Sequence, residues 1–141
     1  MTSVPIEVPD WLGAKSFTPR MTASVGLPVS DALSLVADAL VARGYKVKDR
    51  TGSGFRASWV DKWVLLGIAA ATDIDVKRTR LAVSAVPSDG GSTLTIAVEK
   101  GGEHRAGRRR GREALTEAFQ DAQRRGVPVS TTSWASGTMG T

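Results

Sequence analysis

The sequence predicts an α+β domain in which two helices cover one face of an antiparallel sheet. Two observations favour this class: a β-hairpin pattern over residues 81–98, and two segments with helical periodicity, one between Ser30 and Gly44 and one from Gly107 to Arg125. The expected order is strand, helix, about four strands, helix. Its connections are short, which favours antiparallel neighbours.

The hairpin is the clearest local pattern. Apolar residues alternate with small or polar ones on both sides of Ser88-Asp89-Gly90-Gly91, and these residues are Leu81, Val83, Ala85, Leu94, Ile96 and Val98. Alternation places them on one buried face. Asp-Gly readily takes the positive φ values that a tight connection between twisted strands requires.

The other elements follow from similar signals. A strand begins near Met21, and shorter strands contain Tyr45–Val47 and Phe55–Trp59. Ser30 is the expected N-cap of the first helix, and Gly44 suits its C′ position. Gly126 and Pro128 end the second helix, in which Asp121 and Arg125 form an expected i,i+4 pair.

The predicted organisation is an irregular arm over residues 1–19, one domain over residues 20–126 and a flexible tail over residues 127–141. Residues 63–71 are apolar throughout, so periodicity does not separate a buried strand from a helical turn or an exposed apolar patch. Several antiparallel strand orders fit the same string of elements.

Over residues 20–126, the order of elements resembles that of TATA-binding-protein-like and helix-grip folds. The resemblance rests on order alone, and the chain has too few strands for the deep closed cavity of helix-grip ligand-binding families. Folds of this kind host unrelated activities, so the resemblance implies no function.

The composition limits the class of protein. The formal net charge is +5 and the sequence pI is about 10.1, a bias towards anionic partners. The chain has no cysteine, which excludes disulfides and thiolate chemistry. Neither a signal peptide nor a membrane-spanning run is evident, so a cytoplasmic location is expected. Abundant arginine, alanine, glycine and valine are typical of a bacterial chain from a GC-rich genome.

A basic run around the start of the second helix is the candidate anion-binding site. Its residues are Lys100, His104, Arg105, Arg108, Arg109, Arg110 and Arg112. Positive charge at a helix N-terminus opposes the macrodipole by about 0.3–1 kcal/mol per residue, which suggests nucleic acid, an acidic protein surface or lipid headgroups as a partner. The alternative is a solvated charge run in which Arg109 and Arg110 pair with Glu113.

A second candidate is an apolar partner or ligand surface formed by Trp59, Trp63, Leu65, Leu66 and Ile68. Tryptophan suits the boundary between apolar and wet surroundings, although a buried strand explains the same run. A small apolar ligand between sheet and helices is a further possibility, with a lining of Leu40, Phe55, Trp59 and Phe119.

No catalytic constellation is present. Asp73 and Asp75 form a close carboxylate pair but supply too few ligands for a metal, and His104 is the single histidine. We therefore expect no enzyme activity, metal or cofactor. The leading interpretation is a non-enzymatic binding or scaffold module that acts on another protein or a second copy of itself; the alternatives are nonspecific binding of nucleic acid or another anionic surface, and binding of an apolar ligand.

Overall fold

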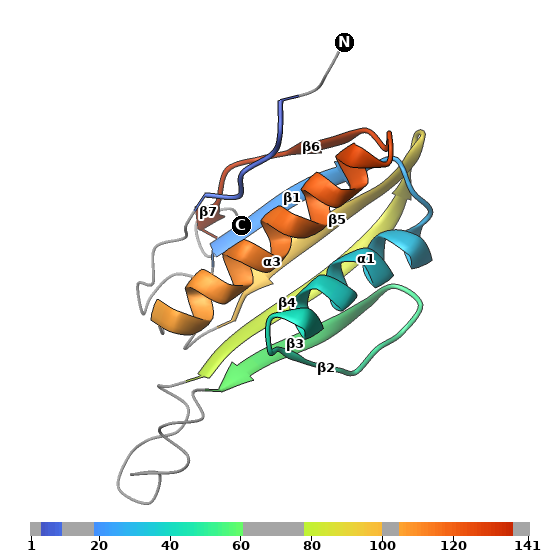
Figure 1. Ribbon diagram of the computed structural model, residues 1–141. Coiled ribbons are helices and arrows are strands. Elements are labelled where there is room, and N and C mark those ends of the chain that lie inside the picture. The colour runs from blue at the N-terminus through green and yellow to red at the C-terminus, as the bar shows by residue number, and fades with distance from the viewer. Residues whose placement is uncertain (1–3, 10–18, 61–77, 100–104, 137–141) are drawn as a thin grey trace, which may run out of the picture.

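A computed structural model describes residues 4–9, 19–60, 78–99 and 105–136 of the chain. Its elements are β1 (Pro19–Val25), α1 (Val29–Ala42), β2 (Lys46–Lys48), β3 (Gly54–Val60), β4 (Arg78–Ser88), β5 (Gly91–Val98), α3 (Arg105–Arg124), β6 (Val129–Thr131) and β7 (Ala135–Ser136) (Figure 1). Neighbouring strands pair in the order β2-β3-β4-β5-β1-β6, and β7 also pairs with β1. The α+β class is confirmed.

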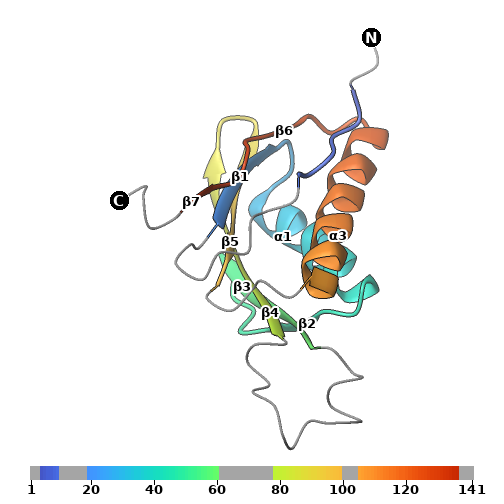
Figure 2. The same ribbon diagram turned by 90° about the vertical axis from the view of Figure 1, so that its left-hand side faces the viewer.

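Both helices pack on one face of the sheet and leave the other uncovered (Figure 2). Every strand pair is antiparallel. Four strands lie between α1 and α3 in the described part of the chain, as the alternation of apolar residues predicts. Strand β1 enters the sheet between β5 and β6, a placement that the sequence leaves open.

The hairpin prediction is confirmed in detail. Strands β4 and β5 pair from Leu81↔Val98 to Ser88↔Gly91, so Asp89 and Gly90 form the connection. Gly90 has a φ of 78° and supplies the left-handed residue. All six alternating apolar residues are buried beneath the helices, and they are Leu81, Val83, Ala85, Leu94, Ile96 and Val98.

Helix α1 ends as predicted but begins differently. Gly44 has a φ of 96°, and the N–H groups of Gly44 and Tyr45 donate to the carbonyls of Val41 and Leu40 in a Schellman arrangement. The N-cap is Pro28, with no side-chain capping hydrogen bond, so the assignment of that role to Ser30 is wrong. Proline fits there because its fixed φ directs the chain into the helix.

The expectation of a flexible tail over residues 127–141 is wrong for two stretches that pair with β1. Val129–Thr131 pairs with Ala23–Val25, and Ala135–Ser136 pairs with Pro19–Arg20. Backbone pairing extends the sheet beyond β1, and Val127, Val129 and Trp134 pack partly against the core. Gly126, with a φ of 82°, turns the chain back from α3 towards this edge.

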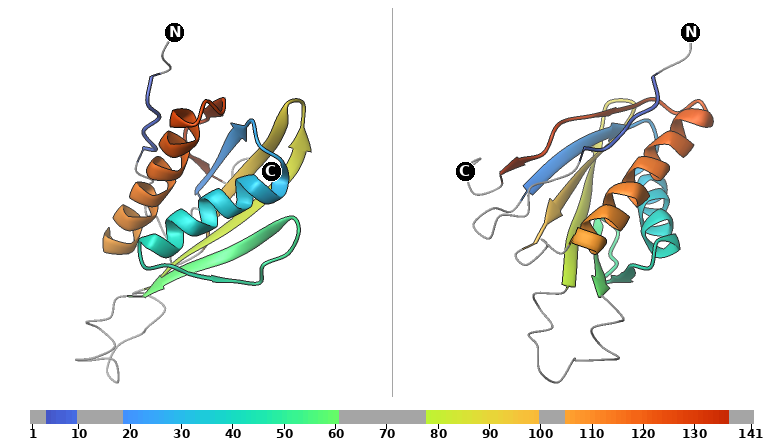
Figure 3. Two further views of the ribbon diagram at one scale, coloured as in Figure 1. Left: turned by 45° about the vertical axis from the view of Figure 1, so that its right-hand side comes forward. Right: turned by 60° about the vertical axis from the view of Figure 1, so that its left-hand side comes forward.

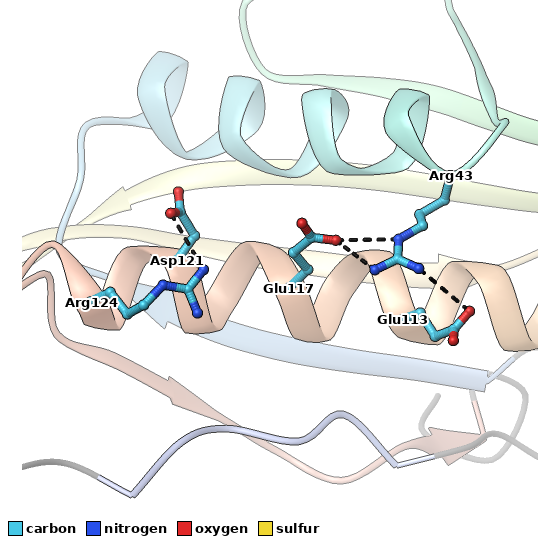
Figure 4. Close-up of polar contacts among 5 residues, drawn as sticks. All are labelled: Arg43, Glu113, Glu117, Asp121 and Arg124. Carbon is cyan, nitrogen blue, oxygen red and sulfur yellow. Dashed lines mark hydrogen bonds and ion pairs between the residues drawn. The ribbon is translucent and has the colours of Figure 1, made fainter.

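Polar contacts join the two helices on their outer surface. Arg43, the C-cap of α1, donates to the Glu117 carboxylate at 2.7 and 3.2 Å and lies 3.8 Å from a Glu113 oxygen (Figure 4). The hydrogen bond to Glu117 raises the pKa of Arg43. The predicted pair within α3 is confirmed, with 2.7 Å between Arg125 and Asp121.

The only tyrosine of the chain is buried under the start of α3. The hydroxyl of Tyr45 donates to the carbonyl of Gly107 at 2.6 Å, and the residue is 2% exposed. Burial raises the pKa of this phenol above its usual value, because the charged phenolate loses its hydration.

We expect the free energy of unfolding to fall as the pH rises above about 10, the usual pKa of tyrosine. Above that pH the unfolded chain loses a proton that the folded chain retains, so alkali favours unfolding. Ultraviolet absorbance of the phenolate should therefore appear together with loss of the circular dichroism signal. Phenolate formation near pH 10 in a protein that keeps its dichroism would contradict the burial.

The matched control for this titration is Tyr45→Phe. It removes the titrating group and the hydrogen bond to the Gly107 carbonyl, so it should cost about 0.5–1.5 kcal/mol of stability at neutral pH.

Candidate functional site

The uncovered sheet face carries its charge at one end only. One cross-strand row contains Lys46, Ser58, Arg80 and Glu99, and the adjacent row contains Lys48, Arg56, Ala82, Ala97 and Arg20. The next two rows are uncharged, with Gly54, Ser84, Thr95 and Thr22 in one and Val86, Thr93 and Ser24 in the other. Five cations and one carboxylate therefore share two rows.

The alternation of each strand explains this placement. Val47 and Ala57 face each other and pack towards the helices, so their neighbours Lys46 and Lys48 project from the uncovered face. Glu99 lies 3.5 Å from the Arg56 guanidinium and partly neutralises it. A shallow surface hollow of about 190 Å³ lies here, lined by Lys48, Asp49, Arg56, Ala57, Ser58, Arg80 and Glu99.

The first turns of α3 lie at the same end of the sheet, on the covered face. Gly107 is buried against Thr79 and Trp59, which face each other on β4 and β3. The hydrogen bond from Tyr45 fixes the same turn. The guanidinium of Arg110 lies 5.8 Å from the centre of the Trp59 ring, within the range of a cation–π contact.

Cations on the two faces thus meet at one end of the molecule, which we name the basic end. Its described residues are Arg20, Lys46, Lys48, Arg56, Arg80, Arg108, Arg109, Arg110 and Arg112. Helix α3 has no acidic residue in its first turn, so its positive dipole end adds to this charge.

Acidic side chains concentrate elsewhere. A groove of about 550 Å³ between α1 and α3 is lined by four carboxylates, those of Asp31, Asp38, Glu117 and Asp121, together with Arg124 and Arg125. Asp31 lies in the first turn of α1, which follows β1 at the opposite end of the sheet (Figure 1). The groove therefore has two more carboxylates than arginines, whereas cations outnumber carboxylates at the basic end.

The structure places only part of the predicted anion-binding run. Arg108, Arg109, Arg110 and Arg112 lie on the first turns of α3, whereas Lys100 and His104 fall outside the described residues. Arg105 begins the helix, two residues before the predicted start, and its side chain is likewise outside the description. The alternative interpretation of this run pairs Glu113 with Arg109 and Arg110. In the structure Glu113 lies 3.8 Å from Arg43, the C-cap of α1.

The predicted apolar surface is mostly outside the described residues, which leaves Trp63, Leu65, Leu66 and Ile68 unplaced. Trp59 is partly buried and packs against the core. Leu40, Phe55 and Phe119 are buried core residues, and neither the groove between α1 and α3 nor the hollow on the uncovered face includes them.

The described residues also bear on metal binding and on membrane crossing. They contain no group of three or more histidine and acidic side chains placed to hold a metal ion. Asp73 and Asp75 fall outside them. Among the described helices, none is long and apolar enough to cross a membrane.

Sequence reasoning missed the sheet cations Lys46, Lys48, Arg56, Arg80 and Arg20. Each of these cations alternates with residues that the strand pattern buries, so the alternation predicts that they lie on the uncovered face. Their convergence depends on register and strand order, which local alternation does not give.

No family model matches the chain, and neither a curated protein nor a solved structure matches it.

Proposed function

We propose that the protein is a non-enzymatic binding module whose basic end contacts an anionic membrane surface. The observation that carries this proposal is the gathering of cations from both sides of the sheet at one end, next to the positive end of α3. Each lysine or arginine near an anionic bilayer contributes about 1 kcal/mol to binding. Acids distant from that end favour one orientation of approach.

The sequence supports lipid over other polyanions. The apolar run over residues 63–71 belongs to the connection between Val60, the last residue of β3, and Arg78, the first of β4. Val60 and Arg78 pair with each other at the basic end. Peripheral membrane proteins combine apolar area with electrostatic attraction to anionic lipid.

Two other partners are less well supported. The four uncovered rows carry no aromatic side chain on which nucleic-acid bases stack. The apolar run over residues 63–71 is also compatible with another protein or a second copy as partner, but the cations on the uncovered face favour an anionic surface.

The test is cosedimentation with phosphatidylcholine vesicles, with and without phosphatidylglycerol. Binding should require the anionic lipid and weaken when salt rises from about 50 to 200 mM. The variant Arg109→Gln/Arg110→Gln should weaken binding about thirtyfold, since two surface cations contribute about 2 kcal/mol. Lys46→Gln/Lys48→Gln should act similarly if both faces contribute.

The matched control is Arg124→Gln/Arg125→Gln. It removes the same charge from two exposed, adjacent arginines, the last residue of α3 and the one after it, at the end of the helix away from the basic end. Equal losses for the two arginine pairs would contradict a localised site. Binding to oligonucleotides without binding to anionic vesicles would overturn the lipid proposal, as would absence of vesicle binding at low salt.

A further inference from the structure

The N-terminal arm, residues 4–9, lies in extended form beside α3 and runs antiparallel to it (Figure 3). Three uncharged polar side chains of the helix face it: Thr116, Gln120 and Gln123. Their i, i+4, i+7 spacing puts them on one stripe of α3. We name the space that the arm occupies the arm groove.

These side chains contact the backbone of the arm. The Gln123 amide accepts from the Ile6 N–H at 2.9 Å and donates to the Val4 carbonyl at 3.0 Å. Gln120 donates to the Ile6 carbonyl at 3.0 Å, and Thr116 accepts from the Val8 N–H at 3.1 Å. The helix thus supplies donors and acceptors at two-residue intervals, as a neighbouring β-strand does.

The arm groove also holds side chains. Val8 is 2% exposed and belongs to the core, and Ile6 packs partly against it. Val4 is 83% exposed. The Trp134 indole, which lies between β6 and β7, donates to the Pro9 carbonyl at 2.6 Å. The groove therefore binds an extended segment with one deeply buried apolar residue.

We infer that the arm groove is a peptide-binding site, which the arm fills in its own chain and which the arm of a second copy fills in an exchanged dimer. A second copy carries the identical Val4-Pro5-Ile6-Glu7-Val8-Pro9 segment, so every contact described above is reproduced. Exchange of an identical element is a low-cost route to dimers.

The length of the chain permits this exchange. Nine residues, 10–18, separate Pro9 from the start of β1 at Pro19. A segment of that length spans up to about 30 Å, about twice the radius of gyration of about 14 Å expected for a chain of this size. The inference does not rest on the membrane proposal, because no basic-end residue supplies the hydrogen bonds that hold the arm, although Arg112 lines a hollow beside Val8, Thr116 and Gln120.

A complementation experiment with two full-length variants tests the inference. Val8→Asp prevents the arm from binding and leaves the groove of that chain vacant. Gln120→Ala/Gln123→Ala removes hydrogen-bonding groups from the groove and leaves the arm intact. A short flexible linker gives a segment an effective concentration of the order of 1 mM. The arm is bound to its own groove at this effective concentration, so the arm of another chain should also bind the groove when that chain is present at about 1 mM. At that concentration of each variant, at least half of the chains should form heterodimers. Sedimentation measures the fraction, and isotope labelling identifies each chain.

Each variant alone should be monomeric under the same conditions. The matched control replaces Val8→Asp with Glu7→Ala, because the Glu7 side chain is exposed and its arm continues to fill the groove. That mixture should give at least fivefold less heterodimer. Folding of each variant is checked by circular dichroism, and Val8→Ser replaces Val8→Asp if the aspartate variant unfolds. Monomers alone in the first mixture would overturn the inference.

Discussion

Replacement of Gly107 by alanine should destabilise the protein by about 1–3 kcal/mol, although alanine ordinarily stabilises a helix interior relative to glycine by about 1 kcal/mol. A Cβ atom at this position would overlap the Thr79 hydroxyl and lie 2.8 Å from the Thr79 Cβ and 2.9 Å from Trp59 Cε3. Relief of these contacts would move the first turn of α3 away from the sheet and strain the hydrogen bond from Tyr45. Urea denaturation measures the change.

A double-mutant cycle tests the cause. Thr79 is fully buried, and its hydroxyl has no hydrogen-bond partner within the described residues, so Thr79→Ala alone removes no polar contact known there. Combined with Gly107→Ala, it should recover part of the lost stability, because the overlapping hydroxyl is gone. Additive losses would show that the two residues do not meet. A stabilising Gly107→Ala would show that α3 does not approach the sheet this closely.

The sequence was sufficient where structure depends on local pattern. The β4–β5 hairpin, the glycine ends of both helices and the Asp121–Arg125 pair are all encoded within a few residues. The prediction of Ser30 as N-cap was wrong because a serine before a helical stripe suggests a capping side chain, whereas the helix begins at Val29 after Pro28. The strands at 129–131 and 135–136 were missed because β1 supplies the partner, about 100 residues earlier in the chain.

The candidate site was predictable in part for the same reason. Consecutive arginines make the start of α3 conspicuous, whereas Lys46, Arg56 and Arg80 come from three strands and meet only through register. Thr116, Gln120 and Gln123 are ordinary helix residues until the arm is placed beside them. Functional surfaces assembled from several elements therefore require the fold, even when the elements are foreseen.

Gly91→Ala should have the largest effect of the substitutions considered, a loss of more than about 3 kcal/mol. The added Cβ would overlap the carbonyl oxygen of Val25 and lie 2.8 Å from Gly26 Cα and 2.9 Å from the Leu27 nitrogen. These are backbone atoms, so no side-chain rotation relieves them. The adjacent Ser92 hydroxyl donates to the Leu27 carbonyl at 2.9 Å, which fixes the same approach of β5 to the β1–α1 connection.

Gly90 provides the control, because it is required for its positive φ, whereas Gly91 is required because backbone atoms lie close to it. Gly90 has a φ of 78° and nothing within 4 Å of an added Cβ, so it needs a left-handed backbone but not space. Gly90→Asn should therefore be tolerated within about 1 kcal/mol, since asparagine adopts this conformation readily. Gly91→Asn should be as damaging as Gly91→Ala. Similar denaturation midpoints for the two asparagine variants would contradict the close packing of β5, on which the register of the uncovered face depends.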